Sequence, residues 1–121
     1  MVNFGEPESV PAKFEDRKFY YHNPQVTLMR TTHEECATLG KIIAEKLNLS
    51  TGPVTVLLPA KAISVISAEG EPFHDPAADL ALFSSVRENL RKDIEIIEKD
   101  YAINDSEFAE ACAQTLLAAL N

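Results

Sequence analysis

The sequence is short of basic residues, and this shortage limits the partners that the protein can bind. It contains 11 Lys and Arg against 19 Asp and Glu, so the formal net charge is -8. Binding to a nucleic-acid backbone needs clustered basic side chains that neutralise phosphates. We therefore expect no direct binding to nucleic acid.

Cysteine is also scarce, with only Cys36 and Cys112 in the chain. The two lie far apart, form no CxxC pair, and have no His nearby at the spacing of a metal site. Both fall in segments predicted to be helical, where a reduced cysteine commonly packs as a small apolar side chain. We expect two reduced cysteines and no metal site.

Long hydrophobic runs are missing as well. No segment reaches the roughly 20 apolar residues that a membrane-spanning helix requires. The acidic N-terminal segment also lacks the basic and apolar regions of a signal peptide. These absences predict a cytoplasmic protein with no membrane association.

The remaining composition is that of an ordinary folded domain. The chain has 121 residues, 45% of them hydrophobic and 25% charged, which is enough for one packed core. Residues 1–24 contain several prolines and little periodicity, so they are predicted to form an irregular leader with one short extended segment at "RKFYY". Residues 25–121 are predicted to form a single α/β domain.

Three strand-helix units follow one another in this domain. Strands are predicted at residues 25–29, at 54–58 and at 94–98, and the second should be central because it is apolar and bounded by prolines. Helices are predicted from residue 32 to 48, from Pro76 onward, and after "NDSE" at residues 104–107. Thr32 with Glu35 has the spacing of a capping box, and so has the start of the third helix. Asp75 with Pro76 has the order of an N-cap followed by proline.

Apolar periodicity predicts which face each helix buries. The predicted buried residues are, in the first helix, Cys36, Leu39, Ile43 and Leu47; in the second, Leu80, Phe83, Val86 and Leu90; and in the third, Phe108, Cys112, Leu116 and Leu120.

Alternation of strands and helices predicts the fold class. We expect a three-layer Rossmann-like sandwich, in which a largely parallel sheet is built from three right-handed strand-helix units with helices on its faces. Complete doubly wound sheets commonly have about five or six strands. The domain is therefore expected to be part of a larger one.

Ligands in such folds bind beyond the carboxyl ends of the strands. Arg30, Thr31 and Thr32 follow the first strand, and Lys61 and Ser64 follow the second. A guanidinium, an ammonium group, hydroxyls and a helix start could together hold a phosphate or a carboxylate. The alternative for the first group is a helix cap in which Arg30 pairs with a carboxylate. The second loop lacks the glycines of a P-loop.

One acidic segment, "EGEPFHD", allows two interpretations. Glu69, Glu71, His74 and Asp75 could form a metal or acid/base site, or a turn in which Asp75 caps the next helix. The nearby proline and the helix start favour the turn. No Ser/His/Asp or Cys/His arrangement can be assembled from the sequence, so the catalytic residues are unknown and enzyme activity is undecided.

Several segments, in order, resemble the C-terminal part of the Tm-one-like ATP-binding protein family. They are "MVNFG", "VPAKF", "YYHNPQVTLMRTTHEE", "GKIIAEKLN", "GPVTVLLP", "EGEPFHDPAADLALF" and "IND..FA", and they span nearly the entire chain. The resemblance implies that the chain is the C-terminal fragment of a longer protein whose N-terminal domain is associated with nucleotide binding. It implies no cofactor in the fragment itself, possible ATP binding in the full-length protein, contact with that N-terminal domain, and a possible homodimer.

The chain departs from the family in the loop after the second predicted strand. The family commonly has "KGVS" followed by "ID" there, whereas this chain has "KAISVIS", with Ala62 in place of Gly and Ser67 where Asp is common. The change removes a residue that adopts positive φ and a carboxylate acceptor.

Two functions are considered for the chain. One is a domain that contributes to an interdomain cleft or an oligomer surface, and the other is a hydrolase or transferase domain for a phosphorylated or carboxylated small molecule.

Overall fold

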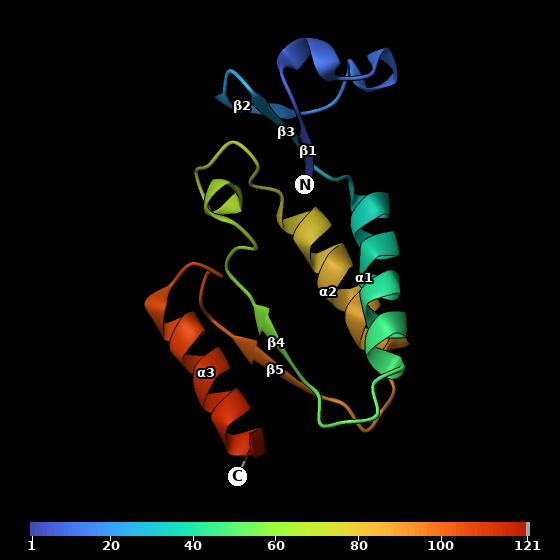
Figure 1. Ribbon diagram of the computed structural model, residues 1–121, viewed down its shortest axis with the longest axis vertical. Coiled ribbons are helices and arrows are strands. Elements are labelled where there is room, and N and C mark those ends of the chain that lie inside the picture. Colours follow the sequence, from blue (N-terminus) through green and yellow to red (C-terminus); the bar gives the residue numbers. More distant parts are fainter. Residues whose placement is uncertain (121) are drawn as a thin grey trace. The chain divides into compact units, whose positions relative to one another are not determined.

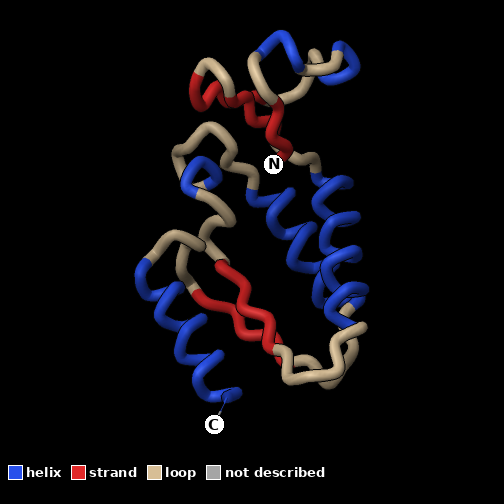
Figure 2. The backbone as a smooth tube through the Cα atoms, in the orientation of Figure 1, coloured by secondary structure: helices blue, strands red, loops and turns tan. Residues whose placement is uncertain are grey.

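The chain folds into two units (Figure 1). The computed structural model describes residues 1–120; the first unit is Met1–Thr32 and the second begins at His33. Figure 2 shows strands in both units, whereas the three long helices all belong to the second. Mixed α/β structure is therefore confirmed, with a small parallel sheet and three α-helices.

The first unit contains a three-stranded antiparallel sheet. Its strands are β1 (Val2–Phe4), β2 (Phe19–Asn23) and β3 (Val26–Met29), and β3 lies in the middle. Asn23 closes the turn between β2 and β3, because its side-chain oxygen accepts a 2.9 Å hydrogen bond from the Gln25 amide. The strand expected at residues 25–29 is confirmed, but its partners are antiparallel and it is not part of the parallel sheet.

The predicted leader is more ordered than expected. Residues 1–24 contain β1, β2 and two short 3-10 helices, Pro7–Ser9 and Ala12–Phe14. The Phe14 ring packs 5.8 Å from the Phe4 ring, and the side chains of Lys13 and Arg17 lie over the Phe14 ring. Aromatic and cation-π contacts thus order a segment in which no periodicity is visible. The expected extended segment is confirmed as β2.

The second unit alternates helices with two parallel strands. Its elements are α1 (His33–Asn48), β4 (Thr55–Pro59), a 3-10 helix (Val65–Ser67), α2 (Pro76–Asn89), β5 (Glu95–Lys99) and α3 (Ser106–Leu120). Strands β4 and β5 pair in parallel, from Thr55 opposite Glu95 to Pro59 opposite Lys99. The predicted positions of all five main elements are confirmed to within one or two residues. β4, which was predicted to be a central strand, has one neighbouring strand among the described residues, so its central position stays a prediction.

Two aspartates mark the helix starts. Asp75 is the N-cap of α2 as predicted, since its carboxylate accepts a 3.0 Å hydrogen bond from the Ala78 amide. Helix α3 begins at Ser106, directly after Asp105, and the capping box expected at residues 104–107 stays a prediction. The Asp105 carboxylate accepts a 2.8 Å hydrogen bond from the Ala102 amide in the preceding turn.

Helices α1 and α2 pack through small residues. Gly40 is buried so tightly that an added Cβ would lie 2.5 Å from the Leu82 carbonyl oxygen. Across the same contact the Ser85 hydroxyl donates a 2.6 Å hydrogen bond to the Ala37 carbonyl. The buried face of α1 is made by residues four apart: Cys36, Gly40 and Ala44.

The predicted stripe of α1 is therefore wrong at its centre. Leu39 and Ile43 are 42% and 43% exposed. The small residues allow the two backbones to approach closely, which no pair of leucines would permit. Leu80 of α2 is likewise exposed, whereas Phe83, Val86 and Leu90 are buried as predicted.

The carboxyl ends of α1 and α2 are joined by polar side chains. The Asn48 side chain accepts a 2.8 Å hydrogen bond from the Arg91 amide and donates a 2.9 Å bond to the Asn89 carbonyl. The Arg91 guanidinium donates to the carbonyls of Asn48 and Ser50, at 3.0 and 2.9 Å. These contacts satisfy carbonyl groups that a helix end leaves without an intrahelical partner.

Different helices pack against the two faces of the sheet formed by β4 and β5. Val56 and Ile96 pack against a cluster that contains Ala44 and Leu90, from the helix pair α1 and α2. Helix α3 lies beside β4 (Figure 1), but Phe108 is its single buried residue among those described. The predicted buried face of α3 is wrong at Leu116 and Leu120, which are 61% and 74% exposed.

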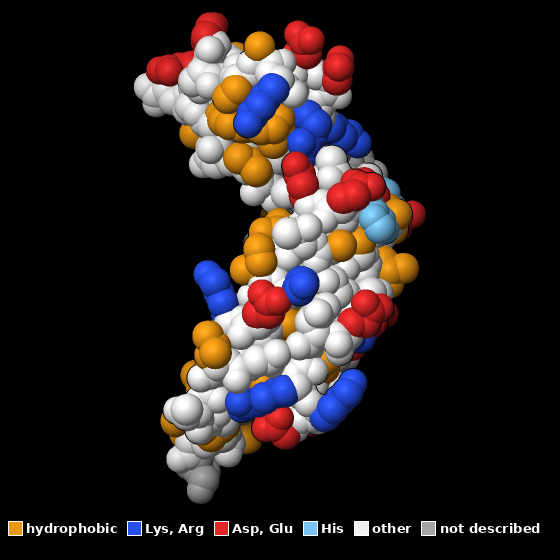
Figure 3. Space-filling view, turned by 90° about the vertical axis from the view of Figure 1, so that its right-hand side faces the viewer, with side chains coloured by type: hydrophobic (Ala, Val, Ile, Leu, Met, Phe, Trp, Pro, Cys, Tyr) orange, Lys and Arg blue, Asp and Glu red, His pale blue; other side chains and the backbone are white. Residues whose placement is uncertain are grey.

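Three further observations concern the surface, the cysteines and the apolarity of the helices. On the face shown in Figure 3, hydrophobic side chains lie among acidic and basic ones rather than in one continuous patch. Cys36 is buried, Cys112 is half-buried, and the two are not joined in a disulfide. Among residues 1–120, no helix combines the length and apolarity needed to cross a membrane.

Candidate functional site

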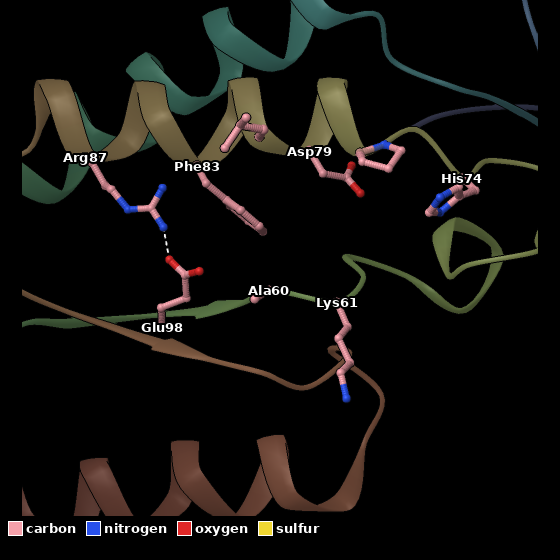
Figure 4. Close-up of a pocket in the computed structure, with 9 residues that line it drawn as sticks. Ala60, Lys61, His74, Asp79, Phe83, Arg87 and Glu98 are labelled. Atoms are coloured by element: carbon pink, nitrogen blue, oxygen red, sulfur yellow. Dashed lines mark hydrogen bonds and ion pairs between the residues drawn. The ribbon is translucent and has the colours of Figure 1, made fainter.

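A cavity of about 290 Å³ lies in the second unit, between α2 and the carboxyl ends of β4 and β5 (Figure 4). This is near the lower limit of the roughly 300–1,000 Å³ found for small-molecule sites. The cavity is lined by Ala60, Lys61, His74, Pro76, Asp79, Leu80, Phe83, Arg87 and Glu98. Its position is that in which open parallel sheets bind ligands.

Helix α2 supplies most of the lining from one face. Pro76, Asp79, Leu80, Phe83 and Arg87 recur at helical spacing. Figure 4 shows the side chains of Asp79, Phe83 and Arg87 pointing from α2 toward the strands. Phe83 is buried and provides an apolar wall, while the carboxylate of Asp79 provides hydrogen-bond acceptors.

Two cationic side chains of the cavity are matched by carboxylates. Arg87 on α2 forms an ion pair with Glu98 on β5, drawn as a dashed line in Figure 4. Lys61 lies 3.7 Å from the carboxylate of Asp100, and both side chains are exposed. In Figure 4 the Lys61 ammonium group points away from α2. The cavity therefore has no excess of positive charge from these groups.

The loop between β4 and α2 places His74 at the other end of the cavity. Within this loop the Ser67 hydroxyl donates to the Ser64 carbonyl at 3.1 Å and accepts from the Ser64 amide at 3.0 Å. The Nδ1 atom of His74 lies 3.4 Å from the Ser67 carbonyl oxygen. Ser67 thus holds a local turn.

The loops after β4 and β5 run side by side. The Ala60 amide donates to the Lys99 carbonyl at 2.8 Å, and the Lys61 amide donates to the Tyr101 carbonyl at 3.1 Å. Ala62 continues this pairing with Ala102. The ends of the second and third predicted strands thus lie together, and Ala62 is accommodated there in extended backbone.

The predicted anion-binding residues fall in different units. Lys61 contributes to the cavity, and Ser64 begins the 3-10 helix that follows it. Arg30, Thr31 and Thr32 belong to the first unit, where the Arg17 guanidinium donates a 2.9 Å hydrogen bond to the Arg30 carbonyl. A shared anion site of these five residues stays a prediction.

The "EGEPFHD" segment forms the favoured turn. Glu69 and Glu71 are exposed, Gly70 has φ of 85°, and Asp75 caps α2. Among residues 1–120, no group of three or more His, Cys, Asp and Glu side chains could hold a metal ion.

Sequence reasoning missed four residues of the cavity. Asp79, Phe83 and Arg87 lie four residues apart along α2, and Glu98 lies on β5. The regular spacing of an acidic, an aromatic and a basic residue on one helix was the available signal. Its meaning depends on the distance between α2 and the strands, which the sequence does not show.

Fold and cavity together define the class of protein: an α/β domain with a small cavity at the carboxyl ends of its parallel strands. The family follows from comparison with known proteins. Residues 1–120 match the C-terminal domain of the uncharacterised protein family UPF0261. The chain belongs to this family, and the predicted resemblance is confirmed.

Relatives occur in bacteria and in a plant. A UPF0261 protein of Rhizobium meliloti is 50% identical over 113 residues, covering 92% of this chain and 28% of the relative. One from Clostridium tetani is 48% identical over 97% of the chain and 29% of its own length. The ToMV resistance protein Tm-1(GCR237) of Solanum lycopersicum is 40% identical over 97% of the chain and 16% of its own length. The chain thus spans less than a third of these relatives.

Proposed function

We propose that the chain is the C-terminal α/β domain of a longer UPF0261 protein and forms one wall of a ligand cleft between that domain and the N-terminal domain. The observation that supports this most strongly is the cavity at the carboxyl ends of β4 and β5. At about 290 Å³ it is small for a complete ligand site. A second domain over its mouth would enlarge it and exclude water.

The larger fold belongs to the same proposal. In the longer protein the parallel pair β4 and β5 would be part of a three-layer Rossmann-like sandwich. Helices that pack beside the pair from different directions support this, as does the alternation of helix and strand after His33. We also propose a cytoplasmic location, supported by two cysteines that are not joined in a disulfide.

We propose that the full-length protein binds ATP in this cleft. The chain offers an apolar wall at Phe83 and acceptors at Asp79 for hydroxyl or amino groups of a ligand. Lys61 and Arg87 already face carboxylates, so the phosphates would need cations from the N-terminal domain. The proposal therefore expects weak or no nucleotide binding by the 121-residue chain alone.

Isothermal titration calorimetry and thermal denaturation with ATP and magnesium test the proposal. The longer protein should be stabilised by about 2.7 kcal/mol when ATP is at a hundred times its dissociation constant. Asp79→Asn should weaken ATP binding at least tenfold, whereas Asp16→Asn, an exposed change in the first unit, should leave it unaltered. Equal binding by both variants would show that ATP binds elsewhere.

An enzyme domain is the second candidate. A hydrolase or transferase for a phosphorylated or carboxylated small molecule is favoured by one observation, the presence of His74 and Lys61 at the same strand ends. A phosphate-release assay on the longer protein with ATP decides between the two. Binding without turnover supports the nonenzymatic cleft, and turnover that is lost in His74→Ala supports the enzyme.

A further inference from the structure

Strand β4 has one edge without a neighbouring strand among residues 1–120. It pairs with β5 along its entire length, and β5 is its one partner in the sheet as described. A sheet of two strands is marginally stable, and an open edge exposes backbone amides and carbonyls that can pair with another segment. We therefore expect another segment to pair with the free edge of β4.

The two strands differ in how their edges are protected. β5 reads "EIIEK", so Glu95, Glu98 and Lys99 place charges along it. β4 reads "TVLLP" and carries no charge. Natural proteins often place charged side chains on edge strands, because a charge opposes the docking of a further strand. The sequence of β5 suits an edge, whereas that of β4 suits a strand with neighbours on both sides.

A groove of about 260 Å³ lies between β4 and α3. Its lining comes from the β4 side and from α3, with no residue of β5, and is entirely uncharged: Pro53, Val54, Thr55, Leu57, Cys112, Thr115, Leu116 and Ala119. Residues 111–120 of α3 carry no charge. Leu116 lines the groove and is 61% exposed. This is the surface that an added strand beside β4 would cover with its side chains.

We propose that in the longer protein an extended segment from outside these 121 residues pairs with the free edge of β4 and fills the groove against α3. This rests on the part of the proposed function that places the chain in a longer protein. The segment would be apolar at alternate positions, because every second side chain of an added strand faces α3.

A segment of the same polypeptide is favoured over a second copy of the chain. The bacterial relatives in which this domain covers 28% and 29% of the length contain ample further sequence. A tethered segment also acts at a high effective concentration, which a separate copy does not.

Hydrogen-deuterium exchange on the 121-residue chain and on the longer protein tests this pairing. Amides of residues 55–58 should exchange at least tenfold more slowly in the longer protein. Leu116→Asp should remove this protection in the longer protein, because it places a charge in the groove. Leu49→Asp is the matched control, since Leu49 is 81% exposed and outside the groove. It should leave the protection intact.

Three results would overturn the pairing. One is equal exchange of residues 55–58 in the short and the long protein. Another is a dimer of the short chain that Leu116→Asp dissociates, which would assign the groove to a second copy. The third is an immunoblot that finds the chain in its cells only as a 121-residue product, which would remove the longer protein from both proposals. ATP binding and its dependence on Asp79 are measured separately, so a failed ligand site leaves the strand pairing standing.

Discussion

Gly40 sets the distance between α1 and α2. A Cβ atom at this position would lie 2.5 Å from the Leu82 carbonyl oxygen and 2.8 Å from the Ser85 Cβ. The first of these is backbone and cannot turn away as a side chain can. The glycine is therefore required by a close approach between two helices, although glycine is otherwise unfavourable inside a helix.

Gly40→Ala should destabilise the protein by about 1–3 kcal/mol, because the helices must separate to admit the methyl group. The better helix propensity of alanine, roughly 1 kcal/mol, offsets part of this cost. Urea denaturation measures the difference. Gly52→Ala is the control, since no atom lies within 4 Å of its added Cβ. Equal losses in the two variants would contradict the close packing.

Asp75→Ala should cost about 1 kcal/mol, because the Ala78 amide loses its acceptor at the start of α2. Asp75→Asn should retain most of the stability, since asparagine caps helices well. The midpoint of thermal denaturation reports both changes. A loss of the same size in Asp16→Ala, at an exposed site, would point to charge rather than capping as the cause.

At the scale of elements, Asn48 joins the ends of two helices and the start of the segment that leads to β5. It accepts from the Arg91 amide and donates to the Asn89 carbonyl, so its removal leaves a donor and an acceptor without their partner. Asn48→Ala should therefore cost about 1–3 kcal/mol in urea denaturation. Asn104→Ala, at an exposed position, should change the stability by less than about 0.5 kcal/mol.

The sequence predicts where elements begin and end better than which face they bury. Prolines, the Asp75 cap and runs such as "VTVLL" mark boundaries through local chemistry, and these boundaries are confirmed. Burial depends on what an element contacts. Leu39 and Ile43 form a good apolar stripe in α1, yet Gly40 and Ala44 face α2 because small residues permit closer contact.

The location of the candidate site could be predicted from the sequence, but the contacts between its residues could not. The strand ends, and Lys61 among them, follow from the alternation of strands and helices. The pairing of Arg87 with Glu98 joins residues of different elements, and Phe83 was expected only as core. These roles depend on how α2 lies along the strands, and the periodicity of the sequence does not reveal that arrangement.

At the scale of the whole molecule, the net charge of -8 governs long-range interactions. It should repel nucleic acid and slow the approach of any polyanion. We predict no binding of duplex DNA at physiological salt in a fluorescence-anisotropy titration, with a basic DNA-binding domain of similar size as the positive control. Binding that weakens steeply as salt increases would contradict the prediction.

The two cysteines lie in different places, so their alkylation rates report on the opening of two different parts of the chain. Cys36 is sealed in the contact between α1 and α2, so an alkylating reagent reaches it only when the helices part. Cys112 lines the groove beside β4 and should react quickly in the short chain. In the longer protein its rate should fall to that at which the added strand detaches, while the rate at Cys36 should change little. Mass spectrometry at successive times would thus measure the rates of two separate openings in one sample, with no engineered cysteine.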